Sequence, residues 1–525
     1  MSETATARAP PAEGARAVMP FAVMTFGMFI ALLDIQIVAS SMQQIGGGLS
    51  AAQDQIGWVQ TAYLIAEIIM IPLSGWLNHV LSTRWLFTAS ALGFTLASML
   101  CGMAWNIDSM VAFRALQGML GAAMIPTVFT ASFHYFQGQR RVYAAAVIGT
   151  IASIAPTAGP IIGGWITDTL SWRWLFYVNL VPGLAVAAGV ALLVDIDSAD
   201  WKLLKGADYP GIALMALFLG SLEYVLEEGA RWNWLSDGTI RSFTTVAAIA
   251  GVLFVARSLT YRNPVVDLRA LRNRDFLLGC MLSFVTGMGI FAPIFLTPLF
   301  LGYVRGYSAW QTGAAVFSTG AASLVGVPFY VALGRKADLR WLMMFGLACF
   351  GVSMWSYSFI THDWGADQLL MPQVLRGFPQ VFAVAPAVTL GLGSLPSQRL
   401  KSASGLFNMM RNLGGAVGIA LCGTILNDQT NAHFVDIAST LTPANGAMRS
   451  LLAAKTAHLA PLLGSTYAGS AAALKQLWDL AYREASTMAY ADAFRMLMVV
   501  CLAAACLVPL MTKPAAPPGT SAAAH

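Results

Sequence analysis

The sequence predicts an all-α polytopic membrane protein with about fourteen transmembrane helices. Of its 525 residues 57% are hydrophobic and only 10% are charged, whereas a soluble protein carries about 25% charged residues. Apolar runs of about 20 residues, each long enough to cross a bilayer, recur along the chain. The net charge of +5 is therefore interpreted as a topology signal, and nucleic acid is not an expected partner.

The distribution of Lys and Arg predicts that both termini face the cytoplasm. With an even number of spans and the N-terminus inside, the cytoplasmic segments hold 18 of the basic residues and the short outer loops hold 4. Such an excess on one side is the positive-inside pattern. The predicted location is the bacterial inner membrane.

An internal repeat indicates two equivalent halves. Arg, Gln, Gly and Pro recur on the fourth and twelfth predicted helices at nearly the same spacing, with Arg and Gln exchanged: Arg114, Gln117, Gly118, Pro126 and Gln373, Arg376, Gly377, Pro386. The glycine-rich fifth helix likewise matches the thirteenth. Each offset is eight helices, which predicts two six-helix bundles and two inserted helices. Parallel repeats of this kind are typical of transporters that rock about a central site.

This repeat sets the expected domain boundaries. The segments are a disordered cytoplasmic tail, an N-terminal bundle, two inserted helices, a C-terminal bundle with a long outer loop, and a second cytoplasmic tail: 1–20, 21–194, 195–262, 263–514 (outer loop 428–489) and 515–525. Within the outer loop, residues 471–484 have the pattern of an amphipathic helix.

The span 144–166 is apolar and uncharged, yet it is rich in Gly and Pro. Small residues let two helix backbones approach closely in lipid, and neighbouring helices compensate for the interior prolines. A close helix contact alone would explain the glycines. The Ala-Pro-x-x-Gly-Pro-x-x-Gly-Gly order, however, resembles the antiporter motif of the major facilitator superfamily, which here comprises Gly149, Pro156, Gly159, Pro160, Gly163 and Gly164.

The whole chain resembles the fourteen-helix drug:proton antiporter branch of that superfamily, and it is similar to EmrB-type permeases. Further motifs carry the resemblance: Leu33-Asp34, 75–77, Arg114 with Gln117 and Gly118, 172–179, 266–269 and 306–308. The resemblance implies the major facilitator fold, export driven by the proton gradient without a cofactor, and an amphipathic small-molecule substrate. It also implies a periplasmic adaptor and an outer-membrane channel as partners.

Two motifs depart from the family pattern. The loop after the second helix has His79 where an acidic residue is usual, and Ser82 where Gly is usual. A charge lock at this loop is therefore not expected in its usual form. On the first helix, Gln36 and Ala39 stand where Thr and Asn are usual, so the cavity surface there is expected to be unusual.

Ionisable residues within spans are energetically expensive and need a reason. Asp34 lies in an apolar stretch of the first helix, and because burial disfavours a charged carboxyl it is the leading candidate for proton coupling. Glu67 on the second helix is a weaker candidate, and a structural role is an equal alternative. Arg114 stays positively charged. The resemblance links its position to proton coupling, with backbone hydrogen bonding as the alternative.

Other polar residues within the spans carry weaker signals. Gln36, Arg376, Arg411 and Asn412 are candidates to face the cavity. On the first inserted helix, Glu223, Glu227 and Arg231 lie four residues apart and share one face. Because the inserted pair is expected to be peripheral, these three are interpreted as structural or interfacial.

Three classes of function remain: a proton-driven exporter, a proton-coupled uptake symporter on the same fold, and a non-transporting receptor or membrane enzyme. The antiporter motif favours export. No phosphate-binding loop, zinc-protease motif or nucleophile elbow is found in the sequence. The six cysteines lack the paired spacing of a metal site. Catalysis and metal binding are therefore not expected.

Overall fold

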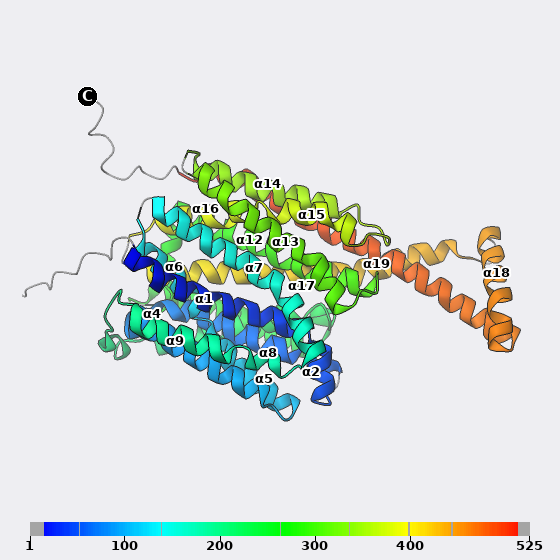
Figure 1. The fold of residues 1–525 in the computed structure, drawn as a ribbon, viewed down its shortest axis with the longest axis horizontal. Coiled ribbons are helices and arrows are strands. Elements are labelled where there is room, and N and C mark those ends of the chain that lie inside the picture. Colours follow the sequence, from blue (N-terminus) through cyan, green and yellow to red (C-terminus); the bar gives the residue numbers. More distant parts are fainter. Residues whose placement is uncertain are drawn as a thin grey trace, which may run out of the picture.

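The computed structural model describes residues 15–51, 53–137, 139–262, 264–334, 336–396, 399–442 and 445–512, and these residues form helices and short connections. Figure 1 shows a bundle of long helices from which an arm made of parts of α17, α18 and α19 extends at one end. Within the described residues, twelve helices have the length and apolar composition needed to cross a membrane.

The N-terminal half ends with α9, and the two inserted helices follow it. Its elements are α1 Ala15–Ala39, α2 Met42–Gly48, α3 Gln53–Ile56, α4 Trp58–Gly102, α5 Ile107–Gly121, α6 Met124–Tyr135, α7 Gln139–Thr169, α8 Trp174–Tyr177 and α9 Leu180–Leu193. The inserted segment holds η1 Trp201–Leu204, α10 Tyr209–Glu228, η2 Trp234–Ser236, α11 Gly238–Thr260 and η3 Leu268–Arg272.

The C-terminal half repeats the order of long and broken helices. Its elements are α12 Arg274–Tyr303, α13 Ala309–Gly334, α14 Leu339–Tyr357, α15 Ala366–Gly377, α16 Gln380–Gly393, α17 Leu400–Thr440, α18 Gly446–Leu463, α19 Thr466–Leu507 and η5 Val508–Leu510. The pair α5 and α6 in the first half and the pair α15 and α16 in the second each form one interrupted span.

The long helix α4 contains two of the predicted spans. Its 45 residues would extend about 68 Å at 1.5 Å per residue, more than twice the hydrocarbon thickness of about 30 Å. The helix is broken at Ser82, whose φ is 72°. Counting α4 as two spans and adding the 31-residue α7, which packs between α1 and α13, gives fourteen spans among the described residues, as predicted.

Close helix crossings occupy matching places in the two halves. A Cβ atom on Gly118 of α5 would lie 3.1 Å from the Tyr63 carbonyl carbon of α4, and one on Gly377 of α15 would lie 2.9 Å from that of Thr319 on α13. The two glycine-rich helices also correspond, because α7 crosses α1 and α17 crosses α12 at glycines. The repeated Gly positions therefore set equivalent backbone contacts.

The first inserted helix is less peripheral than predicted. It packs against α4 and α17, and Glu223 and Glu228 are buried. Asp208 caps the start of α10 and pairs with Arg257 at 2.6 Å, which joins α10 to α11. Arg231 pairs with Glu228 at 3.4 Å. Only α11 has the largely exposed surface expected of an outer helix.

The segment 428–489, predicted as an outer loop, is mostly helical, and its place outside the membrane stays a prediction. Helix α17 continues to Thr440 and α19 begins at Thr466, with α18 between them. Hydropathy falls after residue 426, but no Gly or Pro follows Gly423 before Pro443, so nothing in the sequence ends the helix there. The expected helix at 471–484 is part of α19.

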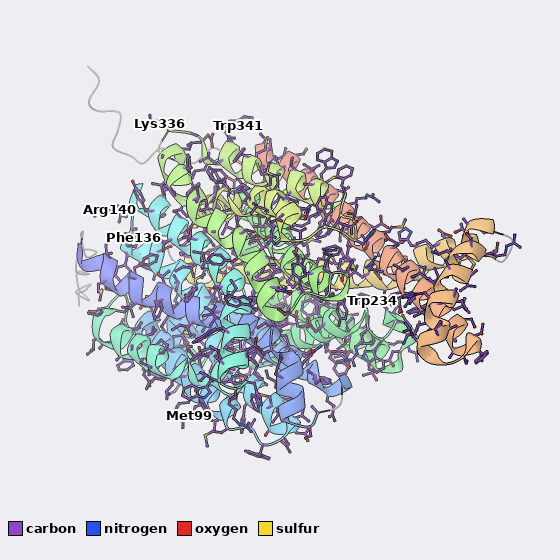
Figure 2. The ribbon with its side chains drawn as sticks, turned by 45° about the vertical axis from the view of Figure 1, so that its right-hand side comes forward. Met99, Phe136, Arg140, Trp234, Lys336 and Trp341 are labelled. Carbon is purple, nitrogen blue, oxygen red and sulfur yellow. The ribbon has the colours of Figure 1, made fainter. Side chains whose placement is uncertain are left out.

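The two ends of the bundle differ in composition. Figure 2 shows Arg140 and Lys336 at the end away from the arm, and Trp234 beside the arm. The last described residues also lie at the end that carries Arg140, where Arg340 donates a 2.9 Å hydrogen bond to the Met511 carbonyl. The topology residues Arg8, Arg335 and Lys513 lie outside the described residues.

Candidate functional site in the N-terminal bundle

An ion pair between Asp34 of α1 and Arg114 of α5 lies at the centre of the N-terminal half. Nη1 of Arg114 is 2.7 Å from Oδ2 of Asp34, and both side chains have an exposed fraction of 0%. Two opposite charges in contact offset much of the penalty for removing each from water, provided that hydrogen bonds satisfy their other polar atoms.

Neighbouring amides complete the coordination of the carboxylate. Asn179 donates a 2.7 Å hydrogen bond to Oδ1 of Asp34, and Gln117 donates one of 3.1 Å to the same oxygen. Asn179 also donates to Ser98 at 3.0 Å, and Ser98 donates to the Phe176 carbonyl at 2.9 Å. The carboxylate is therefore held directly by α5 and by the α8–α9 connection, and Ser98 of α4 supports Asn179.

Helix α4 supports the guanidinium along one stripe. Nε of Arg114 donates to the Val59 carbonyl at 3.2 Å, and its Cζ lies 4.2 Å from the ring centroid of Tyr63. Val59, Tyr63 and Glu67 are successive residues at i, i+4 and i+8, so they share a helix face. The small Gly118 lets α5 approach α4 closely enough for these contacts.

Glu67 connects this stripe to the C-terminal half. It is 3% exposed and interacts electrostatically with Arg411 of α17 and with Arg114. Arg411 is 4% exposed, and its Nε and Nη1 have no hydrogen-bond partner within the described structure. Its guanidinium lies 5.5 Å from the Phe129 ring centroid of α6. Arg411 therefore lies between the halves with spare hydrogen-bonding capacity.

The matching positions in the C-terminal half hold no carboxylate ion pair. Arg376 of α15 donates to the Ile290 carbonyl of α12 at 3.3 Å and to Thr319 at 3.1 Å. Gln373 accepts hydrogen bonds from Ser318 and Thr319 at 2.7 and 3.1 Å. The repeat therefore keeps its positions in both halves, but of these two described sites the one at Arg114 has a carboxylate ion pair and the one at Arg376 does not.

The glycines of the antiporter motif lie at two different contacts. A Cβ atom on Gly159 would lie 3.0 Å from the Gln36 carbonyl carbon, and one on Gly163 would lie 2.7 Å from the Ile37 oxygen. These two glycines therefore pack on α1 next to Asp34. Gly149 instead faces α16 at an ordinary 3.6 Å from Val381 and Val384.

The remaining motif residues are placed less specifically. Gly164 is buried and Pro160 is half-buried within α7, and Pro156 also lies in α7 although its side chain is outside the described part. Asn412 on α17 is half-buried. Gln36 lies where α1 and α7 meet, a contact that Ser41 and Thr167 reinforce with a 2.8 Å hydrogen bond.

Hydrogen bonds tie the region around the break in α4 to the segment that follows α9. The backbone N–H of Thr83 donates to Asp197 at 2.9 Å, and Thr83 Oγ1 donates to Asn78 at 2.9 Å. The Asp200 N–H donates to the Val80 carbonyl at 3.1 Å. The acid next to this part of α4, Asp197, therefore comes from the segment after α9.

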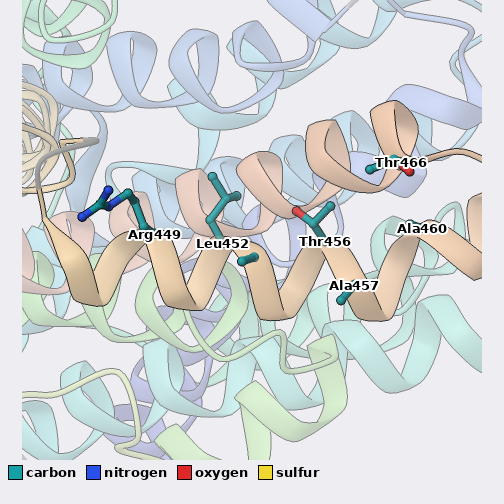
Figure 3. A pocket seen from close by; sticks show the side chains of 7 residues that line it. Arg449, Leu452, Thr456, Ala457, Ala460 and Thr466 are labelled. Atoms are coloured by element: carbon teal, nitrogen blue, oxygen red, sulfur yellow. The ribbon is translucent and has the colours of Figure 1, made fainter.

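The structure also contains a shallow pocket on the arm, far from the ion pair. Figure 3 shows Arg449, Leu452 and Thr456 of α18 lining it, with Thr466 at the start of α19. No residue of the buried network lines this pocket. Within the described ranges no group of three or more His, Cys, Asp or Glu side chains could hold a metal ion.

Asn179 and Ser98 are the site residues that the sequence reasoning missed. Asn179 was noted only as the end of the 172–179 motif, because a neutral amide in a span carries no charge penalty that would draw attention. Its place at the start of a predicted span gave no indication that it contacts Asp34.

Comparison with known proteins identifies the relatives of the chain. The model of the Major Facilitator Superfamily matches residues 24–419. The chain is 37% identical over 503 residues to the colistin resistance protein EmrB of Acinetobacter baumannii, covering 96% of this chain and 97% of that protein. It is 30% identical over 439 residues to the multidrug export protein EmrB of Escherichia coli, covering 83% and 85%.

Two further matches extend this comparison. The fatty acid resistance protein FarB of Neisseria gonorrhoeae is 28% identical over 453 residues, covering 85% of this chain and 87% of that protein. The crystal structure of the human organic anion transporter TETRAN matches with a TM-score of 0.55 at 12% identity, covering 92% of this chain and 99% of that chain. The latter likeness shows the shared fold.

Proposed function

The chain belongs to the major facilitator superfamily, and from this membership we propose that it is a proton-driven exporter of amphipathic small molecules. Relatives that share most of its length are named for multidrug export, colistin resistance and fatty acid resistance. Family membership points to transport rather than catalysis. We further propose that the chain works in a bacterial inner membrane with both termini in the cytoplasm.

The observation that supports proton coupling best is the fully buried pair of Asp34 and Arg114. A proton on Asp34 removes the negative charge that balances Arg114, so the two protonation states differ strongly in electrostatic energy. The bundle that surrounds the pair must respond to that change. Gly159 and Gly163 pack on α1 close to Asp34, and this contact is where we propose that protonation changes helix packing.

Coupling also requires that proton and substrate oppose each other. We propose that a cationic amphipathic substrate competes with the proton for the negative charge near α1, so that binding of either favours release of the other. Glu67 and Arg411 are placed to transmit the change, because they interact across the boundary between the two halves. Rocking of the halves would alter their separation.

The direction of coupling separates export from uptake. In proteoliposomes loaded with ethidium, an amphipathic cation, an exporter moves dye against its gradient when protons flow the opposite way. A symporter moves dye along with the protons. Dye movement opposite to an imposed pH gradient, abolished by a protonophore, supports the proposal, and movement in the same direction as the protons overturns it.

We also propose that the arm of α17, α18 and α19 binds a periplasmic adaptor that leads to an outer-membrane channel. The arm extends beyond the bundle (Figure 1) and exposes Trp478 and Leu474. Trp478 stacks on Tyr482 with 5.0 Å between ring centroids, and Phe434 of α17 lies against both rings. This aromatic cluster gives the arm a fixed apolar surface.

A further inference from the structure

The inserted helix α10 carries a buried acid that the site described above does not use. Glu223 is 4% exposed, and its Oε2 has no hydrogen-bond partner within the described structure. A carboxyl group left unsatisfied in a transmembrane helix is costly and is a functional candidate by default. The sequence interpretation of Glu223 as structural or interfacial assumed a peripheral α10, whereas α10 packs against α4 and α17.

The packing of α10 on α4 brings Glu223 to within about one helical turn of Glu67. A Cβ atom on Gly220 would lie 3.2 Å from Ile69 and 3.5 Å from Ile65. Trp58 stacks on Tyr224 with 5.4 Å between ring centroids. The two helices are therefore antiparallel, with Glu67 at about the level of Gly220 and thus about one turn of α10 from Glu223. Glu223 interacts electrostatically with Glu67 on α4 and with Glu227 on its own helix.

Further charged residues lie on both sides of Glu223 and Glu67. Towards the arm, Glu227 lies one turn further along α10 and next to Glu228, which pairs with the 40% exposed Arg231. Towards the centre, Glu67 interacts with Arg411 and Arg114. Two nitrogens of the Arg411 guanidinium, which is buried on the far side of Glu67 from α10, have no hydrogen-bond partner within the described structure.

We propose that Glu223 is a proton-binding site that passes protons between Glu227, near the arm end of the bundle, and Glu67 at its centre. Each transfer breaks an O–H bond on one carboxyl group and forms one on the next, leaving a carboxylate behind. Glu223 and Glu227 are four residues apart on α10, and such side chains have Cβ atoms about 5–6 Å apart. Their carboxyl groups can exchange a proton across this distance directly or through one water molecule. The inference rests on the proposed proton-driven export.

The test compares Glu223→Gln with Glu223→Asp in proteoliposomes, using ethidium as substrate. Gln keeps the shape of Glu but cannot exchange a proton, whereas Asp can. Two rates are measured for each protein: transport driven by a pH gradient, and exchange of dye across the membrane without a gradient. Asp168→Asn, which neutralises an exposed acid on α7, is the matched control.

We expect Glu223→Gln to slow gradient-driven transport by about a hundredfold or more, the lower end of what a positioned proton-transfer group contributes, while dye exchange continues at the wild-type rate. Glu223→Asp should recover much of the driven rate with an altered pH profile, and Asp168→Asn should match wild type.

Equal driven rates and pH profiles for wild type and Glu223→Gln overturn the inference. Loss of exchange in Glu223→Gln that Asp fails to restore also overturns it, because it indicates a structural role. No driven transport by wild type overturns the proposed function instead.

Discussion

Asn179 donates a 2.7 Å hydrogen bond to Oδ1 of Asp34, while Arg114 holds Oδ2 of the same carboxylate at 2.7 Å. The two donors come from two different segments, the α8–α9 connection and α5. Any change in the charge of Asp34 is therefore felt by three helical segments at once. This is the physical basis on which a proton could change the packing of the N-terminal bundle.

Replacing Asn179 by Leu should slow transport without preventing membrane insertion. The variant removes a hydrogen bond to a charged group, and such a bond contributes about 1.5–3 kcal/mol to the free energy of folding. Asp34 is left with fewer hydrogen-bond donors. The pH profile of gradient-driven ethidium transport should therefore differ from that of wild type. Ser98→Ala, which removes only the second partner of Asn179, should change the profile less. An unchanged profile for Asn179→Leu would show that the amide does not tune the carboxylate.

Gly159 should need to remain without a side chain. Even a Cβ atom there would lie 3.0 Å from the Gln36 carbonyl carbon, and overpacking of this kind costs about 1–3 kcal/mol. Gly159→Leu should therefore block transport while the protein still inserts. Gly149→Ala is the control, because its added Cβ meets only ordinary contacts of 3.6 Å. Normal transport by Gly159→Leu would mean that the close contact is incidental.

Much of the fold follows from the sequence, because its main signals are strong. Apolar runs fix the spans, and the fold class is confirmed by the all-helical structure and the family match. Asp34, Arg114 and Gln117 were predicted as separate candidates from charge in apolar surroundings and from resemblance, and the structure brings them together. Their roles in coupling stay predictions.

Other features could not be read from the sequence, for physical reasons. The break at Ser82 has a positive φ, but the residue is not a glycine, which is the residue type that would have indicated such a conformation. The length of the arm depends on helix continuation beyond the membrane, where hydropathy carries no information. The burial of Glu223 depends on how α10 packs on α4. The spacing of acids four residues apart shows that they share a helix face, but it does not show whether that face is buried or exposed.

The proposed topology predicts the side on which reporter fusions are active. Fusions at Ala9, Gly206 and Lys513 should report a cytoplasmic location, and a fusion at Ser450 in α18 should report the outer side. The reason is the excess of Lys and Arg at one end of the bundle, to which Arg140 and Lys336 belong (Figure 2). An outer signal from Gly206 would contradict the placement of the two inserted helices.

The arm should matter in cells but not in isolated membranes. Replacing Trp478 by Ser removes the central ring of the aromatic cluster and should reduce drug resistance of whole cells, because adaptor binding is weakened. The same variant should transport ethidium at the wild-type rate in proteoliposomes. The exposed Tyr467→Ser, at the opposite end of the arm helix, is the control. Full resistance in cells that lack outer-membrane channels would argue against an adaptor.

The central claim is that Asp34 carries the coupling proton, and one measurement tests it most directly: gradient-driven ethidium efflux in proteoliposomes containing wild type, Asp34→Asn or Asp34→Glu. Asn keeps the size and hydrogen-bond acceptor of Asp34 but cannot exchange a proton, so uphill efflux should be abolished although the protein is inserted and folded. Asp34→Glu should retain partial activity with an altered pH dependence. Uphill efflux by Asp34→Asn at the wild-type rate would contradict the account and would make Glu67 the next candidate.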